Sequence, residues 1–260
     1  MSDCSLDGIG VLVTRPEGQD QTLATRIRAL GGNPVLFPGV RIEALRPDER
    51  ASRTASLGGI DLAIFVSQTA VRFGVPALIE RFGAIGQLRF AAVGQSTAAE
   101  LRKHGVTEVI VPKDGSGGEA LANCSDLQQV AGCSVLVVRG EGGNDTLGSI
   151  LAGRGASVST YECYRRKLPV QDFDAIESLL RGGRIGAWMA TSSEILDNLL
   201  QLAGKHAALL RRTPLFVNHP HIARRAFSQA IEVIFVTAGG DAGLSEGLAT
   251  WFCRPRTSMS

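Results

Sequence analysis

Residues 62–82 read LAIFVSQTAVRFGVPALIERF, and this stretch decides the fold class. Its first five residues are all apolar, which is typical of a strand that is buried on both faces of a sheet. In its second half the apolar residues recur at helical spacing, at Val71, Val75, Leu78 and Phe82. Small polar residues separate the two patterns. The stretch therefore predicts a buried strand, a turn and an amphipathic helix, which together form the repeating unit of a parallel sheet.

The same alternation continues along most of the chain. Short apolar runs predict strands at residues 10–14, 34–37, 62–66, 90–93, 108–111, 134–138, 157–161, 186–190, 214–217 and 232–236. Helical spacing returns between them, for example at Leu23, Ile27 and Leu30. We therefore expect an α/β fold with parallel sheets and helices on both faces.

Composition narrows the class of protein. At about 150 residues per domain, a chain of 260 residues is expected to form two modest domains. Hydrophobic residues make up 44% of it, which excludes disorder. The formal charge of +2 is too balanced for a dedicated nucleic-acid-binding protein, and 5% aromatic residues are few for stacking on bases. No apolar run approaches the roughly 18 residues that would span a membrane.

The cysteines and the first residues indicate a compartment. The start, MSDCSLDGIG, has neither the basic region nor the apolar stretch of a secretory signal. Five cysteines lie at scattered positions without a CxxC pair: Cys4, Cys124, Cys133, Cys163 and Cys253. Such spacing is typical of free thiols in a reducing compartment. We expect a soluble cytoplasmic protein.

Two segments interrupt the rhythm of strands and helices. Residues 40–45 (VRIEAL) and the start of 160–169 (TYECYRRKL) have mixed polarity and read as extended chain, with a proline close behind each. They could be two crossings of a hinge between domains. One domain would then be residues 46–159, and the other would combine 1–39 with 170–260. The residue pattern leaves a simple cut in the middle of the chain equally open.

Most of the strands end in similar polar turns. The turns read VTRPEGQ (13–19), FVSQTAV (65–71), AVGQSTA (92–98), VRGEGGN (138–144), MATSSEI (189–195) and VTAGGDAG (236–243). Taken singly, each reads as a helix N-cap. Taken together, they would lie at the edge of a parallel sheet where ligands bind, with several helix N-termini suited to an anion. Neither GxxxxGK[ST] nor GxGxxG occurs, so a ligand with many carboxylates fits as well as one with phosphates.

Basic residues near these turns add to the anion hypothesis. Arg15 and Arg139 directly follow predicted strands, and Arg165, Arg166 and Lys167 form a cluster in the second extended segment. The alternative for each is a solvated surface charge. No GxSxG motif is present, and the His219-Pro220-His221 pair lacks a third ligand at a diagnostic spacing for a metal.

The chain has two tyrosines, Tyr161 and Tyr164, and both fall in the second extended segment. A phenol there could donate a proton or a hydrogen bond to a ligand. For Tyr161, packing across the linker is at least as good an interpretation. Tyr164, beside two arginines, is the stronger candidate for function.

An ordered set of motifs resembles one known family. The motifs are VLVTRPEGQ, FVSQTAV, AVGQSTAAELRKHG, VLVVRGEGGNDTLGSILAGRGASVSTYECYRR and AGGDAGL, which run from Val11 to Leu244. Together they resemble the uroporphyrinogen-III synthase family over nearly the whole chain.

The resemblance implies a fold and an activity. The fold would be two Rossmann-like α/β domains, one of them discontinuous, joined by a two-stranded linker. The activity would convert hydroxymethylbilane, a small molecule, to uroporphyrinogen III in porphyrin and heme biosynthesis, with loss of water and inversion of ring D. The resemblance also implies a cytoplasmic monomer that uses no cofactor or metal and has no nucleic-acid or membrane partner.

The resemblance carries over to individual residues. Tyr164 corresponds to the linker tyrosine proposed to help the hydroxyl group depart. Ser67, Thr97 and Ser192 would hydrogen-bond the acetate and propionate arms of the substrate. The further binding candidates are Gln68, Thr69, Gly94, Ser193 and Arg15. A negative Asp241 would repel such a substrate, so we expect its side chain to cap the last helix.

A second hypothesis belongs to a different class of function. A non-catalytic two-domain sensor that closes around an anionic metabolite would share the fold and the polar turns. It would be stabilised by its ligand without turning it over, whereas the synthase would produce the inverted isomer.

Overall fold

The computed structural model describes residues 6–83 and 88–252, and the chain divides into two compact units. Unit 1 combines Met1–Ile42 with Lys167–Ser260, and unit 2 is Glu43–Arg166. The two division points fall inside the predicted linker segments, 40–45 and 160–169.

The described part of unit 1 contains one sheet in the order β10-β9-β8-β1-β2, and its strands pair in parallel. Its elements are β1 (Gly10–Val13), α1 (Gln21–Ala29), β2 (Asn33–Leu36), α7 (Asp174–Arg181), β8 (Ile185–Ala190), α8 (Ser193–Ala203), η2 (Gly204–His206), α9 (Ala207–Arg212), β9 (Leu215–Val217), α10 (Pro220–Ser228), β10 (Ile234–Val236) and α11 (Gly240–Phe252).

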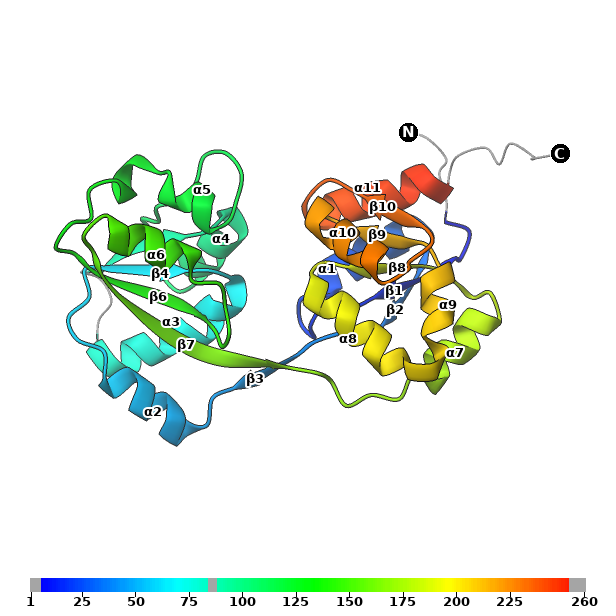
Figure 1. Cartoon of the computed structure of the whole chain (residues 1–260), viewed down its shortest axis with the longest axis horizontal. Helices are drawn as coiled ribbons and strands as arrows, with labels where there is room; N and C mark the ends of the chain where they lie inside the picture. The colour runs from blue at the N-terminus through cyan, green and yellow to red at the C-terminus, as the bar shows by residue number, and fades with distance from the viewer. Residues whose placement is uncertain (1–5, 84–87, 253–260) are drawn as a thin grey trace. The chain divides into compact units, whose positions relative to one another are not determined.

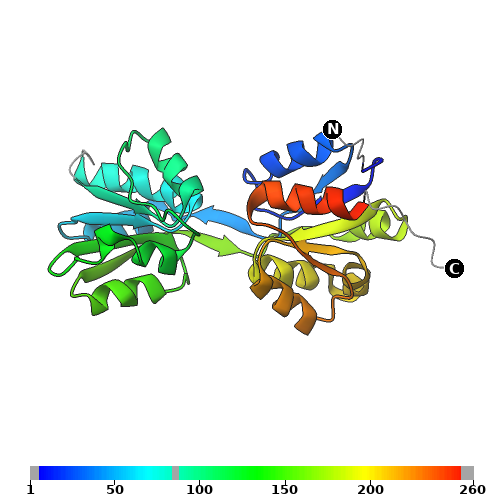
Figure 2. The ribbon, with the colours of Figure 1, turned by 90° about the horizontal axis from the view of Figure 1, so that it is seen from above.

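Both faces of this sheet are covered by helices. Val11 and Val13 pack in a cluster with residues of α1 and α11, whereas Leu12 between them packs with residues of α8 to α10. All three side chains are fully buried. Figure 2 shows α1 and α11 on one face of the sheet and α8 and α10 on the other. The period of two along a strand therefore alternates between two apolar faces, which explains the continuous apolar runs.

The described part of unit 2 contains a second sheet in the order β3-β7-β6-β4-β5, in which β4, β5, β6 and β7 pair in parallel. Its elements, drawn in Figure 1, are β3 (Arg41–Ala44), α2 (Pro47–Ala55), β4 (Leu62–Phe65), α3 (Gln68–Phe82), β5 (Arg89–Ala92), α4 (Gln95–Lys103), α5 (Gly118–Ala122), η1 (Ser125–Leu127), β6 (Ser134–Gly140), α6 (Thr146–Gly153) and β7 (Ser157–Lys167).

The second sheet is also apolar on both faces. Leu62 and Ile64 belong to a buried cluster that includes residues of α5 and α6. On the opposite face, Gly74 of α3 lies close to Phe65 and Val138. The predicted α/β class, with parallel sheets flanked by helices, is confirmed in both units.

One predicted strand is wrong. Residues 108–111 do not form a strand but a single bridge between Ile110 and Ala91 of β5. Ile110 donates its N–H to Phe90 O and accepts from Ala92 N, at 2.8 and 2.9 Å. Pro112 follows two residues later and has no N–H to continue the pairing. The apolar run is therefore too short to add a strand to the sheet.

The predicted strand at 157–161 and most of the second extended segment form one strand. β7 continues without interruption from Ser157 to Lys167 and pairs with β6 as far as Tyr164. Among the described cysteines, Cys124, Cys133 and Cys163 are free thiols, while Cys4 and Cys253 lie outside the described residues.

Candidate active site

Two neighbouring helices of unit 2 begin at the carboxyl edge of its sheet. β4 leads into α3, whose N-cap Ser67 accepts a hydrogen bond from the Ala70 N–H at 3.0 Å. β5 leads into α4, whose N-cap is Gly94 and has no side chain to bond the first amides. Because β4 and β5 pair in parallel, both helix N-termini lie along the same edge.

Tyr164 lies next to the first of these turns. Its hydroxyl is 3.4 Å from Ser67 Oγ, and either oxygen can donate. The residue is 3% exposed, and its ring contacts Phe73 of α3 with centroids 5.9 Å apart. The fold thus joins two predicted site residues that are 97 positions apart in the chain.

The remaining candidates of unit 2 lie in the first turns of α3 and α4. Gln68 is half-buried at the start of α3, and Thr69 beside it is buried. Thr97 is 3% exposed within α4, so its hydroxyl lies in the interior of the turn rather than on the surface. Among the predicted side chains of this unit, Ser67 and Tyr164 contact each other.

A cavity of about 450 Å³ lies at the same edge of the sheet. Val66 and Val93, the residues after β4 and β5, form part of its wall. The rest comes from residues 116–119 at the start of α5, from residues 143, 144, 146 and 147 at the start of α6, and from two arginines, Arg139 and Arg166. This cavity lies entirely within unit 2, so its walls are set by one sheet and by the loops and helix starts that follow its strands.

The arginines that the sequence analysis offered to an anion are paired with the chain's own carboxylates. Arg165 bonds both oxygens of Glu49, at 2.9 and 3.1 Å, and also Glu141 at 2.9 Å. The hydrogen bond from Arg165 lowers the pKa of Glu49 to about 2, and the one from Arg53 lowers the pKa of Glu141. Positive charge at this edge is therefore largely balanced before any ligand binds.

Arg139 is paired in the same way. It reaches Asp145 at 3.3 Å and Glu162 at 3.6 Å, and it donates to the Asn144 carbonyl at 3.0 Å. Its Nε is buried and has no hydrogen-bond partner in the described structure. The main-chain N–H groups of the turns thus remain the principal donors for a carboxylate.

In unit 1, Arg15 follows β1 and forms an ion pair with Asp241 at 2.5 Å. Asp241 lies in the first turn of α11, where its charge is favourable to the helix. That Asp241 caps this helix stays a prediction, and its carboxylate also forms the ion pair with Arg15. The pair leaves Arg15 with less charge to offer a ligand than a free arginine would have.

The turn after β8 has the same kind of serine N-cap as the turn after β4. Ser192 is the N-cap of α8 and accepts the Ile195 N–H at 3.2 Å. Ser193 follows it, and its Oγ is buried with no partner in the part of the chain that the structure describes. The same holds for Oδ1 of Asn218, which follows the adjacent strand β9. Such atoms are costly unless a partner is supplied, which favours ligand contact at this edge.

Comparison with known proteins identifies the family. The family model described as "Uroporphyrinogen-III synthase HemD" matches residues 21–240. Over 235 residues the chain is 34% identical to the uroporphyrinogen-III synthase of Salmonella typhimurium, covering 86% of this chain and 94% of that one. The Escherichia coli enzyme of the same name is 31% identical over 198 residues, covering 75% and 80%. The chain belongs to the uroporphyrinogen-III synthase family.

Solved structures of the family share the fold. A mutant uroporphyrinogen III synthase from Thermus thermophilus covers 94% of this chain and 97% of its own, with a TM-score of 0.58 and 19% identity. The enzyme from Helicobacter pylori also has a TM-score of 0.58, at 14% identity, and covers 94% and 98%. The family is one of enzymes, so this chain is an enzyme of the same type, a cyclising lyase.

Two other kinds of feature, a metal site and a membrane-spanning helix, were also sought in the described residues. Across residues 6–83 and 88–252, no three His, Cys, Asp or Glu side chains are grouped to hold a metal ion. In the same residues, no helix is both long and apolar enough to cross a membrane.

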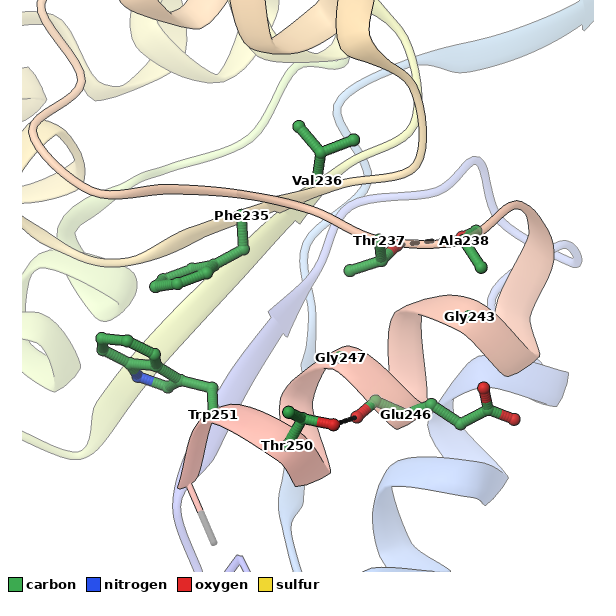
Figure 3. A pocket seen from close by; sticks show the side chains of 9 residues that line it. All are labelled: Phe235, Val236, Thr237, Ala238, Gly243, Glu246, Gly247, Thr250 and Trp251. Atoms are coloured by element: carbon green, nitrogen blue, oxygen red, sulfur yellow. Dashed lines mark hydrogen bonds between the residues drawn. The ribbon is translucent and has the colours of Figure 1, made fainter. Parts of the chain in front are cut away.

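A second pocket, of about 280 Å³, lies in unit 1 between the end of β10 and α11, where Phe235 and Trp251 approach each other (Figure 3). None of the predicted synthase residues lines it.

Sequence reasoning missed several residues at the edge of the second sheet. Ser116, Asn144 and Thr146 line the cavity but were not named as candidates. Asn144 Oδ1 accepts the Thr146 N–H at 2.7 Å and so shapes the turn before α6. The signal in the sequence was an Asn two residues before a Thr at the end of a glycine-rich turn, a pattern typical of such side-chain turns. Ser116 follows the bridged segment at residues 108–111, for which the sequence predicts a strand.

Proposed function

We propose that this chain converts hydroxymethylbilane to uroporphyrinogen III, with loss of water, closure of the ring and inversion of ring D. The proposal rests on membership of the family. One observation supports a role for particular residues in this reaction. It is the contact of the Tyr164 hydroxyl with Ser67 Oγ at the carboxyl edge of a sheet. That edge is where parallel sheets bind their ligands.

The hydrogen bonds of Ser67 allow Tyr164 to act as the acid. Ser67 Oγ already accepts the Ala70 N–H, and it has one proton to donate. If that proton is given to the Tyr164 oxygen, the phenol proton is left for a substrate oxygen. Tyr164 then protonates the departing hydroxyl, the carbon–oxygen bond breaks and water leaves. The remaining phenolate keeps the Ser67 donor and lies near the positive end of α3.

The later steps place few demands on acid–base chemistry. The azafulvene formed by loss of water is attacked by the substituted position of the last pyrrole, giving a spiro intermediate that leads to the inverted ring. The proton lost as the aromatic pyrroles are restored returns to the phenolate. Without the enzyme the chain would close head to tail, without inversion. The protein therefore contributes mainly by holding one conformation of the substrate.

Binding would fall to the turns of each unit. In unit 2 the candidates are Ser67, Gln68, Thr69, Gly94 and Thr97, whose helices α3 and α4 begin at one edge. In unit 1 they are Arg15, Ser192 and Ser193. Carboxylate arms of the substrate would accept from the first amides of these helices. The partnerless Ser193 Oγ favours this role for unit 1, while the pairing of Arg15 with Asp241 makes Arg15 the weaker candidate.

We also propose how the chain is organised and where it works. Residues 40–45 and 160–169 would act as the two-stranded linker between a domain of residues 46–159 and a discontinuous domain of 1–39 and 170–260. Supporting this, β3 and β7 neighbour each other in the sheet, and the two unit boundaries fall in these segments. The chain would act as a cytoplasmic monomer without a cofactor.

The test is an isomer assay with the full-length chain. Hydroxymethylbilane is incubated with the protein, the products are oxidised to porphyrins, and isomers I and III are separated by chromatography. Isomer III, formed faster than spontaneous closure, is expected. Formation of isomer I alone at the uncatalysed rate would refute the synthase. If the compound raised the melting temperature at the same time, the sensor hypothesis would replace it.

A further inference from the structure

The pairing of β6 with β7 is irregular beside Tyr164. Val138 pairs with Tyr161 and Arg139 with Glu162, but Gly140 pairs with Tyr164, so Cys163 has no partner residue on β6. This is a β-bulge, with one extra residue in β7. Bulges redirect side chains and are frequent next to active sites.

The bulge changes the face on which Tyr164 lies. In a regular strand, Cys163 and Tyr164 would point to opposite faces. Here both are 3% exposed and both contact α3: Cys163 Sγ lies 3.7 Å from Ala70 O, and the Tyr164 ring contacts Phe73. Without the extra residue, the phenol would point to the face away from Ser67.

Gly140, which pairs with Tyr164 across the two strands, also affects the position of the phenol. A Cβ added to Gly140 would lie 2.6 Å from Cζ, 2.7 Å from Cε2 and 3.0 Å from the hydroxyl oxygen of Tyr164. The backbone of Gly140 is not in the left-handed region that favours glycine. The glycine is therefore explained by the close approach of the phenol and not by the conformation of the strand.

The backbone around Tyr164 has little freedom to retreat. The Glu141 N–H donates to the Tyr164 carbonyl at 2.9 Å. The next residue, Arg165, is held by Glu141 and by both oxygens of Glu49. A side chain at position 140 would thus displace the ring rather than the main chain, and the hydroxyl would move away from Ser67.

We propose that Gly140, together with the bulge at Cys163, is a positioning element that aims the Tyr164 hydroxyl at Ser67 and the substrate. Gly140 acts through Tyr164 and touches no reacting atom. The inference rests on the proposed function, in which Tyr164 supplies the proton.

The main variant is Gly140→Ala, assayed for isomer III. We expect kcat to fall about 10- to 100-fold, because a displacement of about 1 Å has effects of this size, while KM changes much less. The control is Gly186→Ala, which changes a glycine of β8 in unit 1. An added Cβ there would lie 2.8 Å from Ile9 Cγ2 and 3.5 Å from Phe252 Cζ, so it strains local packing, and none of its nearest atoms belongs to Tyr164 or to the bulge. Its kcat per folded molecule is expected to stay within about twofold.

A double-mutant cycle separates positioning from general damage. In the Tyr164→Phe background, Gly140→Ala is expected to cost little further activity, because the proton donor is already gone. An equal fold-loss in both backgrounds, or wild-type kcat for Gly140→Ala alone, overturns the positioning role. If instead Tyr164→Phe itself retains wild-type kcat, it is the assignment of Tyr164 in the proposed function that fails.

A folding defect in Gly140→Ala would still decide the question. Combining it with Tyr164→Ala removes the ring that the new Cβ meets, so the double variant is expected to fold and to melt above the single one. If the double variant is equally unfolded, the glycine serves something other than the phenol and the inference is overturned.

Discussion

The turns at Ser67 and Ser192 are nearly the same local structure in two different units. Each serine ends a loop after a buried parallel strand, has an extended backbone and caps its helix through the amide three residues on. They differ in what other strands bring to them. Ser67 meets the Tyr164 phenol from β7, whereas Ser192 is followed by Ser193, which has a buried hydroxyl with no partner among the described residues. A shared capping motif can thus support an acid in one unit and offer only binding groups in the other.

The largest expected effect comes from removing the Tyr164 hydroxyl, which distinguishes the turn at Ser67 from the turn at Ser192. Tyr164→Phe should lower kcat for isomer III about 100-fold or more, the usual contribution of a positioned general acid, and leave the fold intact. The Phe ring keeps the contact with Phe73. Steady-state kinetics with a circular dichroism melt would check this. Wild-type turnover would mean that the acid lies elsewhere and that the two turns are more alike than proposed.

The next test treats the two serines as a matched pair. Ser67→Ala and Ser192→Ala should each lower the free energy of unfolding by about 1 kcal/mol, since each loses the same cap. Only Ser67→Ala should lower kcat, by about 10-fold, because it also removes the hydrogen bond to a developing phenolate. Ser192→Ala should act mainly on KM, raising it about threefold. Urea unfolding and steady-state kinetics measure both, and identical kinetic profiles would erase the distinction between the turns.

A smaller effect concerns the charges around β7. Because the pKa of Glu49 is lowered from 4.5 to about 2 by Arg165, its stabilising contribution is present above pH 4.5 and is lost as the pH falls toward 2. Glu49→Gln should therefore lower the urea midpoint more at pH 7 than at pH 3. The exposed Glu232, 3.8 Å from Arg212 in unit 1, provides the control Glu232→Gln, which should change little at either pH. A pH-independent gap would contradict the role of the Glu49 pair.

The smallest effect is expected three residues before Tyr164 on the same strand. Tyr161 is 1% exposed, burial raises its pKa to about 12, and its hydroxyl has no partner among the described residues. Tyr161→Phe removes a buried, unsatisfied group, so the free energy of unfolding should stay within about 0.5 kcal/mol or rise, with kcat unchanged. The same chemical change thus serves as a control for Tyr164→Phe. A large loss of activity here would show that the two phenols do not differ as proposed.

Much of the fold was predictable from local patterns. Runs such as Leu62–Phe65 are apolar at every position, and only a strand covered on both faces accommodates this. The strand predicted at residues 108–111 is wrong, because that prediction used apolar character alone. It took no account of the proline that follows and stops the pairing. The sequence predicted which residues could belong to the candidate site, but it did not predict which residues they contact. Arg15 and Arg165 were treated as free cations, whereas Asp241 and Glu49, far away in the chain, pair with them.

The order of apolar runs and polar turns by itself determined the α/β class, the capping roles of Ser67 and Ser192, and the family, because each depends on neighbours in the chain. Only the tertiary structure decided that Tyr164 meets Ser67, that Cys163 is an extra residue in β7 and that Gly140 leaves room for the phenol. These features depend on the register between strands, and a shift of one residue turns every following side chain to the other face. No pattern within a single strand encodes that register.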